Sequence, residues 1–116
     1  MEQQLITDTK ESYYLYASGI AQGCNQIAND LRTGQIENAL NSIANLAEGI
    51  EWLLNVEQIL AQHNLKIRSR IMEANEFLME VNDALIQNDT ITVADLFEYE
   101  IQPLFDSASE WAFQEQ

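Results

Sequence analysis

Four successive segments of the sequence place apolar residues at alternating spacings of four and three, the repeat of an α-helix that packs along one side. The scarcity of turn-forming residues, four glycines and one proline in 116 residues, also disfavours a many-turned β fold. The pattern therefore predicts an all-α fold with four core-forming helices. The four series are Tyr13, Ala17, Ile20, Cys24, Ile27 and Leu31; Ile36, Leu40, Ile43, Ala47, Ile50 and Leu54; Ile67, Ile71, Ala74, Leu78, Val81 and Leu85; and Ala94, Phe97, Ile101, Leu104, Ala108 and Trp111.

The breaks between these series are short and fall near residues 33–34, 63–64 and 88–90. Because short connections force neighbouring helices to run antiparallel, we expect one domain, residues 1–116, folded as an up-down-up-down four-helix bundle. Pro103 lies inside the fourth series, where it removes a backbone N–H and crowds the preceding turn. We therefore expect the last helix to be kinked or broken at Pro103.

The formal net charge of −14 argues against nucleic acid and against anionic membrane surfaces as partners. No Lys or Arg follows Arg70. No apolar stretch is long enough to span a membrane, and the N-terminal residues lack the pattern of a signal peptide. Cys24 is the only cysteine, so no intrachain disulfide can form. We expect a cytoplasmic protein.

Residues able to carry out catalysis are scarce, so we expect no enzymatic activity and no cofactor. His63 is the only histidine and lies at a predicted helix end, and Cys24 falls in a core series. The carboxylates Glu73, Glu76, Glu80 and Asp83 follow one side of the third helix, nearly opposite its core series. They are therefore expected to face solvent instead of holding a metal. Two interpretations stay open, general acidity for solubility or a surface for a basic partner.

The second helix carries more apolar residues than one packed face needs. Those outside its predicted core series are Leu46, Trp52, Leu53, Val56, Ile59 and Leu60. Either this helix lies at the centre of the packing, or its outer face is a partner or dimer contact, since an exposed tryptophan with aliphatic neighbours is typical of a binding hot spot. The candidate partner-binding residues are Trp52, Val56, Ile59, Leu60, Glu73, Glu76, Glu80 and Asp83.

The run Ala94-Asp-Leu-Phe-Glu-Tyr-Glu-Ile-Gln-Pro-Leu104 resembles the Asp-Leu-Leu-Glu-Tyr-Glu-x-x-Pro motif of an uncharacterised family of small acidic helical proteins from Gram-positive bacteria. The spacing of Glu80, Asp83 and Asn88 before it fits the same family. This resemblance implies a helical fold and a bacterial cytoplasmic origin, and it implies no activity. A weaker likeness, in length, acidity, an early tyrosine-rich helix and a late tryptophan, is to the flagellar export chaperones.

Together these features predict a non-catalytic protein-interaction module that binds a protein partner or forms a homodimer. The alternative is a small acidic export or assembly chaperone that holds an amphipathic helix of a client through anchors spaced along one helix face.

Overall fold

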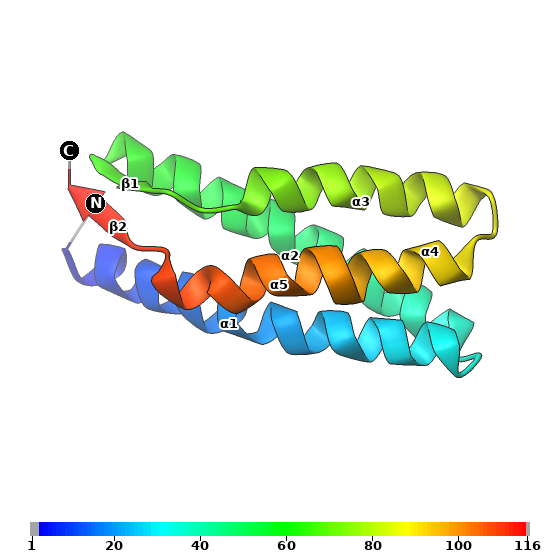
Figure 1. Cartoon of the computed structure of the whole chain (residues 1–116). Coiled ribbons are helices and arrows are strands. Elements are labelled where there is room, and N and C mark those ends of the chain that lie inside the picture. The colour runs from blue at the N-terminus through cyan, green and yellow to red at the C-terminus, as the bar shows by residue number, and fades with distance from the viewer. Residues whose placement is uncertain (1–2, 116) are drawn as a thin grey trace.

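The computed structural model describes residues 3–115 and contains four antiparallel helical segments, which confirms the predicted all-α four-helix fold (Figure 1). The first three segments are α1 (Gln3–Arg32), α2 (Ile36–Gln62) and α3 (Ile71–Ile86). The fourth segment consists of α4 (Thr90–Asp95), the π-helix η1 (Leu96–Ile101) and α5 (Gln102–Asp106), followed by the 3-10 helix η2 (Ser107–Glu110). The molecule is elongated, with extents of 47 × 20 × 20 Å.

The three connections each use a residue in the left-handed backbone region. Gly34 has φ of +82°, Asn64 of +66° and Asn88 of +57°. Glycine adopts this conformation without steric cost, and asparagine tolerates it better than most residues. The chain therefore turns where the breaks between the apolar series predict.

The fourth segment changes its hydrogen-bond pattern just before Pro103. The backbone N–H of Gln102 donates to the carbonyl oxygen of Phe97, five residues earlier, which is the spacing of a π-helix. Pro103 has no N–H to donate to the carbonyl oxygen of Tyr99. The expected kink or break takes the form of a widened turn, and the backbone on both sides of it stays right-handed helical.

A small two-stranded sheet, which the sequence does not predict, lies at the end of the bundle where α1 begins. Strands β1 (Leu65–Ile67) and β2 (Phe113–Glu115) pair antiparallel, with Ile67 opposite Phe113. The backbone N–H of Phe113 also donates a 3.1 Å hydrogen bond to the hydroxyl oxygen of Tyr14. Ile67 was expected to open the third helical series and lies instead in β1, because α3 begins only at Ile71.

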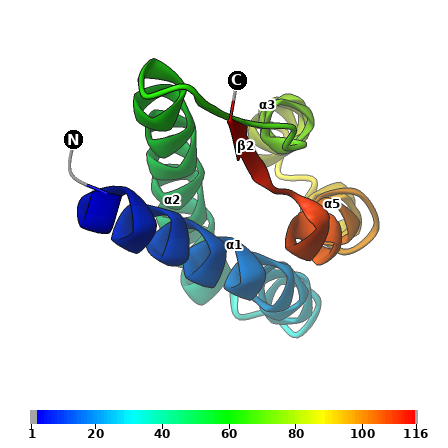
Figure 2. The same cartoon turned by 90° about the vertical axis from the view of Figure 1, so that its left-hand side faces the viewer.

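Helix α1 contacts both α2 and the fourth segment, whereas contact between α2 and α3 is much slighter. Figure 2 shows the four segments around a common core, with α1 next to both α2 and α5. At the C-terminal end of α1, the Arg32 guanidinium group makes ion pairs of 3.0 Å with Asp95 and 3.1 Å with Glu98. These two pairs join the end of α1 to the fourth segment.

The first and fourth apolar series are buried throughout, as predicted. The prediction for α2 is wrong, because only Ile43 and Ile50 of its series are buried, while Ile36, Leu40 and Ala47 are exposed. The helix is rotated about its axis relative to the predicted face. Its buried residues are Ala39, Ile43, Leu46, Ile50, Leu53, Val56 and Leu60.

Candidate functional site: a groove between α1 and α2 and an acidic face on α3

Trp52 does not project freely from the outer face of α2. Its ring meets that of Tyr16 of α1 edge-on, with the ring centroids 5.9 Å apart and the planes at 82°. It remains 40% exposed. Tyr16 reaches this position by lying across Gly49, where a β-carbon would collide with the end of the Tyr16 side chain. Trp52 is therefore part of the contact between the first two helices.

The expectation that Val56 and Leu60 belong to an outer face is wrong. Both are buried, because the rotation of α2 turns this side of the helix into the core. Leu46 and Leu53, also expected outside the core series, are buried for the same reason. Of the four predicted apolar partner-binding residues, only Trp52 and Ile59 are exposed, and only they remain available to a partner.

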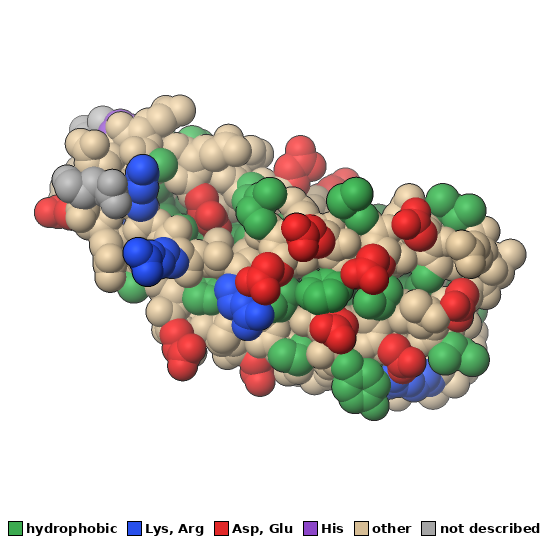
Figure 3. Space-filling model, turned by 45° about the horizontal axis from the view of Figure 1, so that its top comes forward, with side chains coloured by type: hydrophobic (Ala, Val, Ile, Leu, Met, Phe, Trp, Pro, Cys, Tyr) green, Lys and Arg blue, Asp and Glu red, His purple; other side chains and the backbone are tan. Residues whose placement is uncertain are grey.

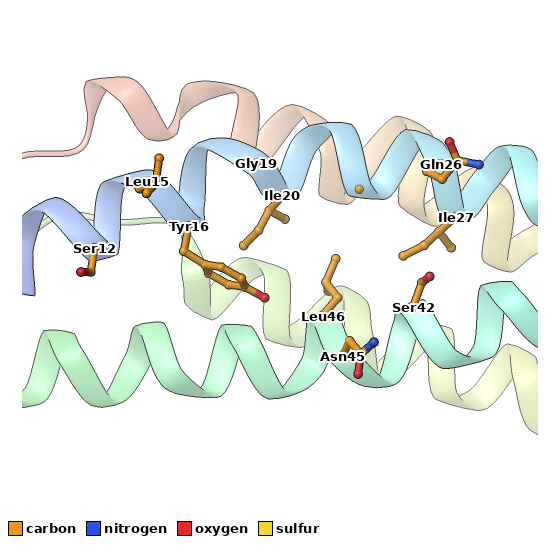
Figure 4. Close-up of a pocket in the computed structure, with 11 residues that line it drawn as sticks. Ser12, Leu15, Tyr16, Gly19, Ile20, Gln26, Ile27, Ser42, Asn45 and Leu46 are labelled. Atoms are coloured by element: carbon orange, nitrogen blue, oxygen red, sulfur yellow. The ribbon is translucent and has the colours of Figure 1, made fainter.

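A groove of about 570 Å³ runs between α1 and α2 next to the Tyr16–Trp52 contact. Figure 4 shows Tyr16, Ile20 and Ile27 reaching from α1 toward α2, and Leu46 reaching back from α2. Leu15, 78% exposed, stands at its edge. The lining is mostly apolar, with hydroxyl and amide groups and no charged side chain. The residues that line it are Ser12, Leu15, Tyr16, Gly19, Ile20, Gly23, Gln26, Ile27, Ser42, Asn45 and Leu46.

Two glycines four residues apart, Gly19 and Gly23, form part of the α1 side of this groove. A β-carbon added at either position would meet no atom within 4 Å, so no neighbour in the described chain requires a glycine there. Gly49 differs, since Tyr16 occupies the space beside it. A glycine inside a helix costs about 0.5–1 kcal/mol relative to alanine. The pair thus weakens α1 without serving the packing of residues 3–115.

The same stretch of α1 is electrically neutral. No residue from Ser12 to Asn29 carries a charge, although the chain as a whole has a net charge of −14. The stretch is absent from the predicted partner-binding residues, because Gly19 and Gly23 lie inside a helix and mark no turn. The signal that could have identified it is the combination of a Gly-x-x-x-Gly pair with a long uncharged run in an acidic protein.

The four carboxylates predicted to lie on one side of α3 are all exposed, as expected. Glu73 accepts two hydrogen bonds from the Arg70 guanidinium group, at 2.8 and 3.0 Å, and these hold the pKa of Glu73 below its ordinary value. Within residues 3–115, Glu76, Glu80 and Asp83 make no ion pair. These carboxylates belong to α3, which contributes no residue to the α1–α2 groove.

Two groups in the core have raised pKa values. Burial raises the pKa of the Cys24 thiol to about 12. Burial and then the hydrogen bond to Glu57 raise the pKa of the Tyr13 hydroxyl group well above its usual range. The Glu57 carboxylate accepts bonds from both Tyr13, at 2.7 Å, and Ser69, at 2.8 Å. This carboxylate is half-buried, and both bonds reach the same oxygen atom.

Among the described residues, no group of three or more His, Cys, Asp or Glu side chains is arranged to hold a metal ion. Across the same part of the chain, no helix combines the length and the apolar character needed to cross a membrane.

Comparison with known proteins identifies a family but no activity. Neither the curated proteins nor the solved structures contain a match to this chain. One family model matches residues 8–110, which include most of α1 and all of the other three helical segments. The chain therefore belongs to the family described as "Domain of unknown function (DUF8042)".

Proposed function

We propose that this protein is a non-catalytic protein-interaction module that accepts a helix of a partner protein in the groove between α1 and α2. The observation that carries the proposal is the pair Gly19 and Gly23, whose missing side chains leave open space on α1. Small residues at this spacing allow the backbone of a second helix to approach closely. A helix with apolar residues along one face would cover the groove and the exposed side chain of Leu15.

The chemistry of the groove supports a helix as its occupant in preference to a nucleic acid or a charged small molecule. Its lining has no charged side chain, and the net charge of −14 would repel phosphate groups. The hydroxyl and amide groups of Ser12, Ser42 and Asn45 can bond to polar groups at the edge of a docked helix. An export or assembly chaperone of the flagellar type, acting in a bacterial cytoplasm, is a special case of this proposal, because such a protein also holds a client helix.

Self-association is the second candidate, and the uncharged run from Ser12 to Asn29 favours it. Two copies that each carry a charge of −14 repel one another over most of their surfaces. They would meet with least repulsion through this neutral stretch of α1. In such a dimer, Leu15 of one copy would enter the groove of the other.

The decisive experiment fills the groove and leaves the rest of α1 unchanged. The test variant is Gly19→Leu with Gly23→Leu. The matched control is Asn25→Leu with Asn29→Leu, which adds the same side chains at the same spacing on exposed positions that do not line the groove. Leucine is a better helix former than either residue it replaces, so neither variant should unfold α1.

We expect the wild type and the control to capture the same protein from the source organism, and the groove-filled variant to lose it. The purified partner should also shift Trp52 emission to shorter wavelength, while buried Trp111 gives a constant background. Equal capture by all three proteins would contradict the proposal. Light scattering over a range of concentrations separates the second candidate, since a wild type that stays monomeric excludes self-association through this groove.

A further inference from the structure

The outward side of α3 carries a row of three apolar side chains that are each about two-thirds or more exposed. Met72 is 66% exposed, Met79 69% and Ile86 72%. They are seven residues apart, so they lie on the same side of the helix. Single exposed apolar residues are ordinary, but three at heptad spacing form the repeat with which one helix packs along another.

Carboxylates occupy the positions between these apolar residues. Glu76 and Asp83 complete an outward series with the spacing four, three, four and three, in which apolar and acidic side chains alternate: Met72, Glu76, Met79, Asp83 and Ile86. Figure 3 shows hydrophobic and acidic side chains interspersed over this part of the surface. A hollow of about 640 Å³ lies on the same face, lined by residues of α3 that include Met72, Met79 and both carboxylates.

We infer that this face of α3 binds an amphipathic helix whose apolar residues alternate with Lys or Arg at the complementary spacing. The exposed apolar side chains of α3 insert between side chains of the partner helix, and the hollow on the same face receives apolar side chains of the partner. Neither Glu76 nor Asp83 has a cationic partner within residues 3–115, so both are free to pair with the basic residues of the docked helix.

A second copy of this chain does not fit as the occupant. The chain has only five basic residues, Lys10, Arg32, Lys66, Arg68 and Arg70, and α2, α3 and the fourth helical segment contain none. Helix α1 carries two, near its opposite ends, and Arg32 already pairs with Asp95 and Glu98. Two α3 faces placed together would oppose carboxylates to carboxylates. Charge complementarity therefore selects a basic helix from a different protein.

This surface is independent of the α1–α2 groove, and a synthetic peptide can test it without knowledge of the natural partner. The probe is a labelled helical peptide of about three heptads, with leucine at every seventh position and lysine at the intervening seam positions. A peptide of the same composition in scrambled order is the peptide control. Fluorescence anisotropy at low and at physiological salt gives the dissociation constants.

The test variant, Glu76→Gln with Asp83→Asn, removes two charges with little change in shape. Its matched control, Glu48→Gln with Glu51→Gln, removes two exposed charges from α2, so the two proteins have the same net charge. We expect the test variant to bind the ordered peptide about five- to twentyfold more weakly than the wild type, and the control to change binding less than about twofold. Met72→Ser with Met79→Ser should weaken binding by about tenfold or more, including at high salt.

Each alternative outcome overturns the inference. Equal weakening by the two charge-removing variants would mean that only overall acidity attracts the peptide, and equal binding of the scrambled peptide would mean that the spacing of the row is irrelevant. Binding that is lost in the groove-filled variant and kept in the α3 variants would place the peptide between α1 and α2. Failure of the peptide to bind the wild type also overturns it and leaves the groove proposal intact.

Discussion

The Tyr13 hydroxyl group of α1 donates a 2.7 Å hydrogen bond to the Glu57 carboxylate of α2, a half-buried group next to the buried Val56. Ser69, just before α3, donates to the same carboxylate oxygen at 2.8 Å. Three segments of the chain thus meet at one partly buried carboxylate. Because a buried acceptor without a donor is costly, the pair Tyr13–Glu57 is a point where a small change has a measurable effect.

Tyr13→Phe should lower the free energy of unfolding by about 1–2 kcal/mol, because it removes one of two donors to Glu57 and leaves the carboxylate less satisfied. Chemical denaturation followed by circular dichroism measures this change. Tyr99→Phe is the control, since Tyr99 is exposed and its loss of a hydroxyl group should change stability little. Equal effects of the two substitutions would show that the bond to Glu57 contributes nothing specific.

The two kinds of helical glycine should respond differently to alanine. Gly19→Ala and Gly23→Ala should each raise the free energy of unfolding by about 0.5–1 kcal/mol, because the new methyl group meets open space. Gly49→Ala should give little or no gain, because it displaces Tyr16 from its contact with Trp52. Thermal denaturation gives the stabilities, and Trp52 fluorescence reports the displacement.

A double-substitution cycle tests the cause of the Gly49 effect. In a Tyr16→Ala background the obstacle is absent, so Gly49→Ala should stabilise the protein as much as Gly19→Ala does. If Gly49→Ala remains neutral or destabilising in that background, Tyr16 is not the reason that a glycine is needed at this position.

Asp89 should stabilise the start of α4 in a pH-dependent way. Its side chain accepts hydrogen bonds from the backbone N–H of Thr92 at 3.1 Å and from the Thr92 hydroxyl group at 2.6 Å, and these bonds lower the pKa of Asp89. A lowered pKa in the folded state stabilises the protein fully above the ordinary pKa of 3.8, and this contribution is lost as pH falls through the lower folded value. Asp89→Ala should therefore lower Tm at neutral pH, and the difference from the wild type should shrink in strong acid. Asp83→Ala, at an exposed carboxylate of α3 without an ion pair in residues 3–115, is the control. An equal loss of Tm in the two variants would contradict the role of the bonds to Thr92.

Cys24 should resist alkylation in the folded protein. Its pKa is raised from the ordinary 9.0 to about 12, which lowers the thiolate fraction near pH 8 by about a thousandfold, and the thiol is also buried. Iodoacetamide should modify it at the rate of unfolding in native buffer and rapidly in denaturant, as measured by mass spectrometry. Rapid modification in native buffer would mean that the core around Cys24 opens easily.

The sequence predicts the number, order and direction of the helices because periodicity and turn residues are local signals. It does not predict the rotation of α2, because the predicted and the buried series have nearly the same spacing, share Ile43 and Ile50, and differ in the side of the helix that they bury. The role of Glu57 is also hidden in the sequence, since a carboxylate reads as a surface group until Tyr13 and Ser69 are known to bond to it.

The candidate site was predictable only in part. The sequence correctly predicts that the α3 carboxylates are exposed, since their angular position follows from the core series of the same helix. It places Val56 and Leu60 outside the core, where the structure buries them, because it assigns the wrong face of α2 to the core. The groove depends on how α1 packs against α2, and the sheet pairs residues that are 46 to 50 positions apart, so neither feature has a local signal in the sequence.

The bond between Tyr14 and Phe113, which joins positions 99 residues apart, has a consequence for the order of events during synthesis. Helix α1 leaves the ribosome before the other described elements and can pair with α2 as soon as that helix follows, because only a short connection separates them. Its other flank packs against the fourth segment and stays bare until almost all of the described chain has been made. The apolar side chains on this flank of α1 are therefore exposed to solvent while the hairpin of α1 and α2 is already formed. The hydrogen bond from β2 to Tyr14 of α1 forms only after the fourth segment has been made.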